Sequence, residues 1–366
     1  MSATFKLMVP GPTPLPPQVM KELAEPMIYH RDEEFCQIVF SVVGMLRELL
    51  GNEEGDVLLI PASGRGGMEA ALVNVFSPGD RILAVSNGHF GEIFADMAKR
   101  FKLEVVHLQF DWHEELECSE IEAVLGRDSD IKGVLVTHCE TSNAVINDIE
   151  AVGKITEKYG RLLVVDAVSS LGCTPINMDQ WGIDVVISAS QKGLMCPAGL
   201  SVVGISQRAW EAVETSTSPR YYFDFAAMRK FIEKGQTPVS TPVSLVRALK
   251  VALDLMKKET FAKVYQRHDN LSQYIKEEAV KLGYVLYPEN DAVTRASGLS
   301  AFSLPENINS ADLVGYARDE YKTIFAKGLG KNASRVLRVG HMGWFHEEDA
   351  RHAVQVLKGL IERFGL

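Results

Sequence analysis

The sequence lacks the features that mark membrane, secreted disulfide-rich and nucleic-acid-binding proteins. It has no run of about 18 apolar residues, which a membrane-spanning helix requires. Its five cysteines are scattered without a CxxC pair, so neither a disulfide framework nor a zinc site is indicated. Aspartate and glutamate number 48 against 38 lysines and arginines, and this acidic balance disfavours binding to a phosphate backbone. We therefore expect a cytoplasmic protein with no signal peptide and no membrane, nucleic-acid or metal partner.

The length and the order of apolar segments predict two domains behind an N-terminal arm. Five prolines between Met8 and Pro17 exclude a helix there, so residues 1–17 form an arm. From Asp56, short apolar strands alternate with amphipathic helices, and this pattern continues to a helix that ends near Lys258. We expect a large domain over residues 18–258 and a smaller α+β domain over residues 259–366.

The alternation of strands and helices predicts an α/β fold with a mostly parallel sheet between two layers of helices. Strands are expected at 57–60, 81–85, 103–108, 131–136, 162–165, 185–187 and 201–205. Helices are expected at 33–50, 67–76, 90–101, 119–125, 149–159 and 245–258, with a loop over 214–242. In the small domain, helices are expected at 264–282, 311–321 and 347–364, and strands at 284–287, 298–304 and 336–339.

Two of these strands end on groups that suggest a pyridoxal phosphate site. The strand 162–165 is followed by Asp166, and the strand 185–187 breaks into Ser-Ala-Ser-Gln before Lys192. Ligands of α/β proteins bind at the carboxyl edge of the sheet. Pyridoxal phosphate needs a lysine to form a Schiff base and a carboxylate that keeps its pyridine nitrogen protonated. The alternative is that Lys192 is a solvated loop charge.

The glycine-rich run Ala62-Ser63-Gly64-Arg65-Gly66-Gly67 joins a strand to a helix and predicts an anion site. Backbone N–H groups at a helix N-terminus bind phosphate, and glycines allow close approach. The run contains no GxxxxGK, and Glu69 stands at the third glycine of a dinucleotide-binding fingerprint, which disfavours a nicotinamide dehydrogenase. A glycine-rich turn that merely packs the helix on the sheet is the alternative.

Two further strand ends carry side chains suited to a planar cofactor. Phe90, between glycines, can stack on a ring or can be the first core residue of the next helix. Thr141 can hydrogen-bond a phenolic oxygen. The neighbours His138, Cys139 and Glu140 could suggest metal ligands, but three consecutive residues at a strand end cannot all face one ion.

An arginine, Arg338, lies inside the apolar strand of the small domain. A buried guanidinium needs a partner, which can be a substrate carboxylate bound in bidentate fashion or an internal salt bridge. Four strand ends and this arginine together form a more specific pattern than any one of them.

The combined motifs resemble the class V aminotransferases of fold type I, and most closely the alanine/serine–glyoxylate branch. The resemblance spans essentially the whole chain, from the PGPTPLPP arm onward. It implies a pyridoxal phosphate enzyme with a large cofactor-binding domain. The runs that carry it are ASGRGGMEAALVNV, VSNGHFGE, THCETSNAV, LLVVDAVSSLGC, GIDVVISASQKGL, CPAGLSVVG and RVLRVGHMG.

The resemblance also implies a role for each site residue. Lys192 would be the Schiff-base lysine and the base for the proton shift, and Asp166 would pair with the pyridine nitrogen. Arg338 would bind the substrate α-carboxylate, with Gly11 of the arm beside the substrate. The remaining cofactor contacts would be the phosphate group (Ser63, Gly64, Arg65, Gln191), the ring faces (Phe90, Val168) and the phenolic oxygen (Thr141).

In this family a Thr/Pro segment of a second subunit also reaches the phosphate, which implies a homodimer with shared sites. Here that segment holds Thr237, Ser240 and Thr241, and the sequence leaves open which hydroxyl is used.

The expected reaction is transfer of an amino group from alanine or serine to glyoxylate or pyruvate. One alternative is a 2-aminoethylphosphonate–pyruvate transaminase, in which Arg31 could bind the phosphonate. A pyridoxal phosphate lyase such as a cysteine desulfurase is disfavoured, because it needs a cysteine in the C-terminal part and the last one is Cys196. Arg65 stands where relatives often carry histidine or a small residue, and Phe90 where some carry tryptophan, so the identity of the substrate is the least determined prediction.

Overall fold

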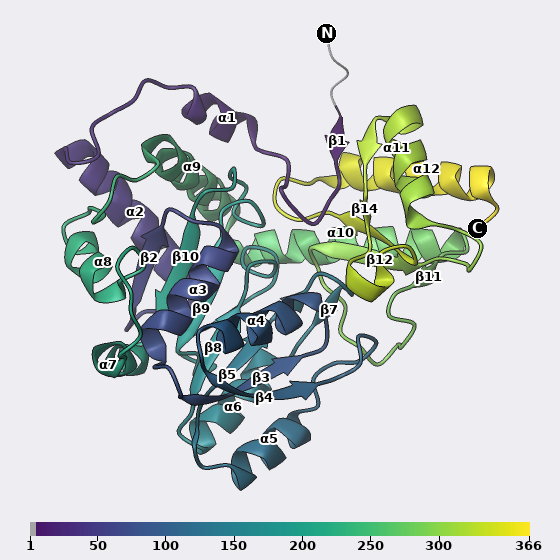
Figure 1. Cartoon of the computed structure of the whole chain (residues 1–366). Coiled ribbons are helices and arrows are strands. Elements are labelled where there is room, and N and C mark those ends of the chain that lie inside the picture. The colour runs from purple at the N-terminus through teal and green to yellow at the C-terminus, as the bar shows by residue number, and fades with distance from the viewer. Residues whose placement is uncertain (1–4) are drawn as a thin grey trace.

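A seven-stranded sheet forms the centre of the molecule (Figure 1). The structure, a computed structural model, describes residues 5–366. The strands are β2 (Asp56–Ile60), β3 (Arg81–Ser86), β4 (Glu104–Gln109), β5 (Ile131–Thr137), β8 (Leu162–Asp166), β9 (Val185–Ala189) and β10 (Ser201–Ile205). Their order is β2-β10-β9-β8-β5-β3-β4, and β10 runs antiparallel to both of its neighbours while the pairs from β9 to β4 are parallel. The predicted α/β class with a mostly parallel sheet is confirmed.

Helices between the parallel strands cover both faces of this sheet. They are α3 (Gly64–Val75), α4 (His89–Arg100), α5 (Cys118–Arg127) and α6 (Ile149–Lys158). The chain moves along the sheet in one direction from β2 to β4 and returns from β4 through β5 to β8. Because such crossovers are right-handed, α3 and α4 lie on one face and α5 and α6 on the other.

The helix α2 (Glu33–Leu50) has the bounds that its periodicity predicts. Phe35, Val39, Val42, Leu46 and Leu49 recur at spacings of three and four residues and are all buried. The helix ends at Gly51, whose φ of 57° is the left-handed conformation typical of a helix C-terminus. The buried stripe packs against the rest of the large hydrophobic core.

A second, antiparallel sheet forms the C-terminal part, with its own hydrophobic cluster. Its strands are β11 (Val285–Leu286), β12 (Leu299–Ser303), β15 (Val336–Gly340) and β14 (Ala326–Lys327), in that order, and its helices are α10 (Phe261–Lys281), α11 (Ser310–Tyr321) and α12 (Glu347–Phe364), with a short 3₁₀ turn at Gly330–Asn332. Between α9 (Val243–Glu259) and α10, Thr260 has a φ of 76° and breaks the helical path. This break lies beside the predicted domain boundary at 258/259, which stays a prediction.

The segment before α9 differs from the sequence-based expectation. The predicted loop over 214–242 is wrong in part, because α7 (Gln207–Thr215) extends into it and α8 (Phe225–Ile232) lies within it. The start of α8 is capped by Asp224, whose side chain accepts a hydrogen bond from Ala227 N at 3.0 Å. Phe225, Met228 and Ile232 bury its inner face, a short apolar pattern hidden among Ser, Thr, Pro and Tyr.

The N-terminal arm contains two regular elements at its ends. Strand β1 (Lys6–Leu7) pairs in parallel with β13 (Thr323–Ile324) of the C-terminal part. Helix α1 (Pro17–Leu23) begins at the last proline of the arm, because the fixed φ of proline suits the first position of a helix. Between them, residues 8–16 are not helical, as the prolines predict.

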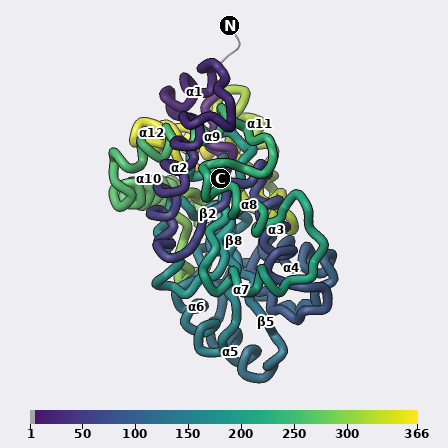
Figure 2. Tube along the Cα trace, turned by 90° about the vertical axis from the view of Figure 1, so that its left-hand side faces the viewer, coloured from purple at the N-terminus to yellow at the C-terminus, as the bar shows by residue number. Residues whose placement is uncertain are grey.

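The turned view shows α1 and α5 at opposite ends of the molecule (Figure 2). Within residues 5–366, no helix has the length and apolar character that crossing a membrane would require.

Candidate active site

Lys192 follows β9 and lies beneath the N-terminal arm. Its Nζ donates a hydrogen bond to the Pro10 carbonyl. Gly11 packs so closely that a Cβ there would lie 2.6 Å from Lys192 Cδ, so a larger residue would displace the lysine. Thr13 N donates to the Gln191 carbonyl at 3.2 Å, and Thr13 Oγ1 donates to the Lys192 carbonyl at 3.1 Å. The arm therefore forms one wall of the site. Of the arm residues, the sequence analysis placed only Gly11 in the site.

Asp166 ends β8, next to β9, and faces Lys192. Burial raises the pKa of Asp166 to about 6, while a hydrogen bond from Val168 N and the Lys192 charge lower it. Burial lowers the pKa of Lys192 to about 8, because a charged amine is costly away from water. An acid that is mostly ionised at pH 7 thus stands beside an amine that loses its proton more readily than an exposed lysine.

The N-terminus of α3 is open toward this pair. Ser63 is the N-cap residue and exposed, and its side chain makes no capping hydrogen bond. Gly64 lies against Val168, since a Cβ at Gly64 would be 2.7 Å from Val168 Cγ2. Arg65 is exposed in the first turn of the helix. The structure thus places the predicted phosphate segment beside the residues that follow β8.

Two residues that are expected to bind the cofactor phosphate carry a buried polar side-chain atom without a partner. In the part of the chain that the structure describes, the Gln191 Oε1 and Thr241 Oγ1 atoms are buried without a hydrogen-bond partner. A buried polar group without a partner is unfavourable by about 1–3 kcal/mol. A bound phosphate could accept from the Gln191 amide, from the Ser63 hydroxyl and from the first N–H groups of α3.

Phe90 lies in the first turn of α4, next to the buried carboxylate of Glu140. The sequence did not indicate that Glu140 would contact Phe90. Glu140, in the short strand β6 (Cys139–Glu140), is fully buried. Its Oε2 accepts from Phe90 N at 2.9 Å and from Gly91 N at 3.1 Å. These donors lie far away in the sequence, so no local pattern could reveal the contact.

Arg338 reaches from β15 to the turn that follows β6. Its Nη1 donates to the Thr141 carbonyl at 2.7 Å and its Nε to the Lys327 carbonyl at 2.9 Å. Within residues 5–366 it forms no ion pair, so the internal salt bridge considered from the sequence is wrong. Burial lowers the pKa of Arg338 to about 10, and the Glu140 charge offsets part of this change. The part of the Arg338 guanidinium that makes no hydrogen bond remains available to bind a carboxylate.

The Thr/Pro segment before α9 is held near the start of α2. Thr237 is buried and its Oγ1 donates to the Val239 carbonyl at 2.7 Å, whereas Ser240 is exposed. Arg31 Nη1 donates to Gln236 Oε1 at 2.7 Å, and the guanidinium lies over the Phe231 ring. The hydroxyl of Thr237 is therefore already engaged.

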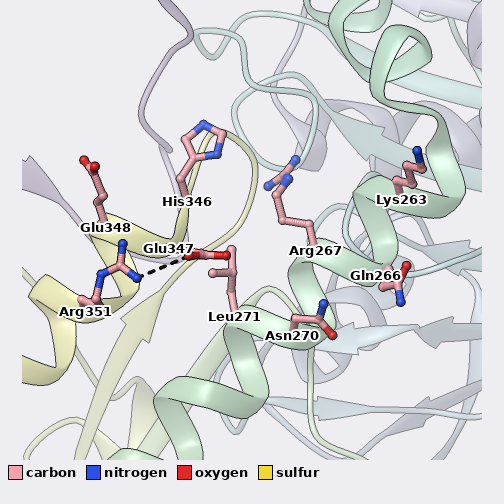
Figure 3. Close-up of a pocket in the computed structure, with 9 residues that line it drawn as sticks. All are labelled: Lys263, Gln266, Arg267, Asn270, Leu271, His346, Glu347, Glu348 and Arg351. Carbon is pink, nitrogen blue, oxygen red and sulfur yellow. Dashed lines mark hydrogen bonds and ion pairs between the residues drawn. The ribbon is translucent and has the colours of Figure 1, made fainter.

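A surface pocket between α10 and α12 lies outside this constellation (Figure 3). Two of its charged residues form ion pairs, Arg351 with Glu347 and Arg267 with Glu259. Arg267 also donates to the Gly343 carbonyl at 3.1 Å, and a Cβ at Gly343 would lie 3.3 Å from the Lys192 carbonyl, so the pocket adjoins the segment that contains Lys192. The lining residues are Lys263, Gln266, Arg267, Asn270, Leu271, His346, Glu347, Glu348 and Arg351.

Residues 7–341 match the family described as Aminotransferase class-V. The chain belongs to this family and is a transaminase. Class V aminotransferases are generally dependent on pyridoxal phosphate.

Several relatives resemble the chain over nearly its full length. One, 36% identical over 98% of this chain and 93% of its own, is named soluble hydrogenase, small subunit, from Synechococcus sp.. An L-aspartate–glyoxylate aminotransferase of Paracoccus denitrificans is 33% identical over 100% of this chain and 93% of its own. A serine–glyoxylate aminotransferase of Methylorubrum extorquens is 35% identical over 93% and 87%. The crystal structure of an alanine–glyoxylate aminotransferase from Nostoc sp. has a TM-score of 0.94 and 28% identity, covering 99% of this chain and 96% of that one.

The hydrogenase name belongs to that relative. In this chain, residues 5–366 contain no group of three or more histidine, cysteine or acidic side chains placed to hold a metal ion.

Proposed function

We propose that the protein is a pyridoxal phosphate-dependent aminotransferase that moves an amino group from a small amino acid, alanine or serine, to glyoxylate or pyruvate. The observation that carries this proposal is the convergence of Lys192, Asp166 and the open α3 N-terminus at one edge of the sheet, with Arg338 facing them. Glyoxylate is the oxo acid in the names of all three aminotransferases described above, whereas the amino donor differs.

The residues divide the work according to their chemistry. When bound, the cofactor supplies an electron-withdrawing ring that stabilises negative charge at the substrate Cα. Asp166 would keep the ring nitrogen protonated, and Lys192 would hold the cofactor and then serve as the base that moves the substrate proton. Phe90 and Val168 enclose the ring, and Thr141 hydrogen-bonds the phenolic oxygen.

Two groups of residues bind the anionic ends. Ser63, Gly64, Arg65 and Gln191 hold the phosphate, and Arg338 holds the substrate α-carboxylate next to Gly11.

The proposed enzyme is a homodimer whose sites are shared. Thr237 is engaged by the Val239 carbonyl, so the hydroxyl that reaches the partner's phosphate would come from the exposed Ser240 or from Thr241, whose Oγ1 has no hydrogen-bond partner among the described residues. Met27, Tyr29 and Tyr221 are exposed by 69%, 57% and 96%, and a second copy of the chain would cover such side chains. The cytoplasmic location stays a prediction.

An absorbance titration tests the proposed reaction directly. Purified protein with pyridoxal phosphate is expected to show a visible band that alanine or serine bleaches and glyoxylate or pyruvate restores. Bleaching by 2-aminoethylphosphonate alone would favour the phosphonate alternative, although Arg31 is already bonded to Gln236. A band that no donor bleaches would favour lyase chemistry, and no band at all would contradict the cofactor assignment.

Replacing Arg338 by alanine is expected to raise KM for the amino acid and for the oxo acid alike. Both carry the α-carboxylate, and a charged hydrogen bond is worth about 1.5–3 kcal/mol, which corresponds to roughly 10- to 100-fold in KM. Steady-state kinetics with each substrate varied in turn measures the effect. Arg335→Ala is the matched control. Arg335 lies just before β15, the strand that carries Arg338, and its side chain donates to the Pro305 carbonyl. Wild-type KM values in Arg338→Ala would remove the arginine from substrate binding.

A further inference from the structure

Glu140 is a buried carboxylate that the proposed reaction does not use. Its side chain accepts four hydrogen bonds, two from the start of α4 and two from Ser142. Ser142 N lies 3.1 Å and Ser142 Oγ 2.8 Å from Glu140 Oε1. Such hydrogen bonds to an ionised acceptor are about twice as strong as neutral ones.

The backbone around Glu140 leaves the carboxylate no room to move. A Cβ at Gly88 would lie 2.3 Å from Glu140 Cγ, so glycine is required where the chain enters α4. The Glu140 carbonyl accepts from Ala144 N at 2.9 Å, which closes the turn that carries Thr141. The side chain is thus enclosed on one side by the start of α4 and on the other by this turn.

These contacts join three parts of the site that are far apart in the sequence. The carboxylate binds the amide of Phe90 directly, and it fixes the turn that carries Thr141. The carbonyl of Thr141 in turn accepts from Arg338 Nη1. One carboxylate therefore connects the ring-facing aromatic, the hydroxyl and the carboxylate-binding arginine.

The charge of Glu140 fits this position. In the described part of the chain it forms no ion pair, and the N-terminus of α4, where a negative charge is favourable, supplies two of its donors. Burial raises the pKa of Glu140 to about 6, and its hydrogen bonds with Ser142, Gly91 and Phe90 oppose this rise. The carboxylate is also the group whose charge favours the charged form of Arg338.

We propose that Glu140 is a positioning residue that sets the places of Phe90, Thr141 and Arg338 relative to one another. It acts through these three residues and does not touch the substrate. This inference rests on the proposed function, since it names the residue that orders the same site.

The test compares Glu140→Gln with Asp184→Asn. Asp184 is also buried, accepts from Leu163 N at 2.7 Å and from Ser206 Oγ at 2.9 Å, and lies at the other end of the sheet. In the protein without cofactor, Glu140→Gln is expected to speed hydrogen exchange at the Phe90 and Gly91 amides by roughly tenfold or more, as loss of one or two charged hydrogen bonds implies. Asp184→Asn is expected to leave these two amides unchanged.

With the cofactor bound, Glu140→Gln is expected to shift the visible absorbance maximum and to raise KM for the oxo acid roughly 10- to 100-fold, since a misplacement of about 1 Å can cost about 100-fold. Asp184→Asn is expected to lower thermal stability without either change. A Glu140→Gln protein that loses stability but keeps wild-type exchange, spectrum and KM would overturn the positioning role.

A milder variant covers the case in which Glu140→Gln does not fold. Ser142→Ala removes one of the four hydrogen bonds to Glu140, together with the one that Ser142 Oγ accepts from His89 N at 3.1 Å. It is expected to change exchange and KM in the same direction by a smaller factor. Wild-type values in folded Ser142→Ala would contradict the proposal. The exchange measurement needs no cofactor, so it tests the positioning role of Glu140 separately from the proposed function. The proposed function fails instead if the wild-type protein binds no pyridoxal phosphate.

Discussion

Replacing Lys192 by alanine is expected to abolish covalent cofactor binding and to lower turnover on the order of 10⁴-fold, the upper end of what acid–base catalysis contributes. The variant loses both the amine that anchors the cofactor and the base that moves the proton. Removing the side chain takes one hydrogen bond from the Pro10 carbonyl, whereas the hydrogen bonds of Thr13 to the Gln191 and Lys192 carbonyls still hold the arm in place, so the fold is expected to remain. The measurement is a visible absorbance scan together with circular dichroism.

Lys276→Ala is the matched control for this experiment. Lys276 is another buried lysine whose Nζ donates to one carbonyl, that of Ala296 at 2.9 Å, and burial lowers its pKa to about 8 as well. It lies on α10 in the C-terminal part of the chain, whereas Lys192 follows β9 of the large sheet. The Lys276→Ala protein should keep the visible band, and persistence of the band in Lys192→Ala would refute the assignment of the anchoring lysine.

Replacing Asp166 by asparagine is expected to keep the cofactor bound but to lower turnover on the order of 100-fold, the range seen when one preorganised charge interaction is removed. Asparagine can still accept the hydrogen bond from Val168 N, but it cannot hold the proton at the ring nitrogen. The cofactor content is measured by absorbance and the turnover by steady-state kinetics.

The comparison for Asp166→Asn is again Asp184→Asn, which makes the same chemical change to a buried aspartate outside the site. Turnover in Asp184→Asn should stay near wild type at a temperature where the protein is folded. If Asp166→Asn turned over as fast as wild type, Asp166 would have no part in the chemistry.

The sequence predicts the large sheet well because each of its strands is a short apolar run that ends in polar residues. The seven expected strands all appear, most of them within one or two residues of the predicted bounds. Helix α8 was missed because its apolar face is formed by three residues only, in a segment whose composition is typical of a loop. Strand β1 was missed because its pairing with β13 depends on a partner more than 300 residues away.

The candidate site, too, could be predicted in part only. Lys192, Asp166 and Gly64 could be predicted together because the carboxyl ends of parallel strands share one edge, whereas Val168 follows only from the family resemblance. Glu140 could not, since its role depends on amides of α4 that lie about 50 residues earlier. In the proposed homodimer, the choice among Thr237, Ser240 and Thr241 would depend on contacts with the second chain, which no sequence pattern describes.

The two ends of the seven-stranded sheet carry different kinds of polar group. At the carboxyl end, Lys192 and Asp166 have few hydrogen bonds of their own. At the amino end, Asp184 is saturated by Leu163 N, Ser206 Oγ and Arg208. We therefore expect that substitutions around Lys192 and Asp166 can alter donor preference without weakening the hydrogen bonds of Asp184. A directed-evolution library for substrate range can be confined to the surroundings of these two residues, with Glu140 and the amino end kept unchanged.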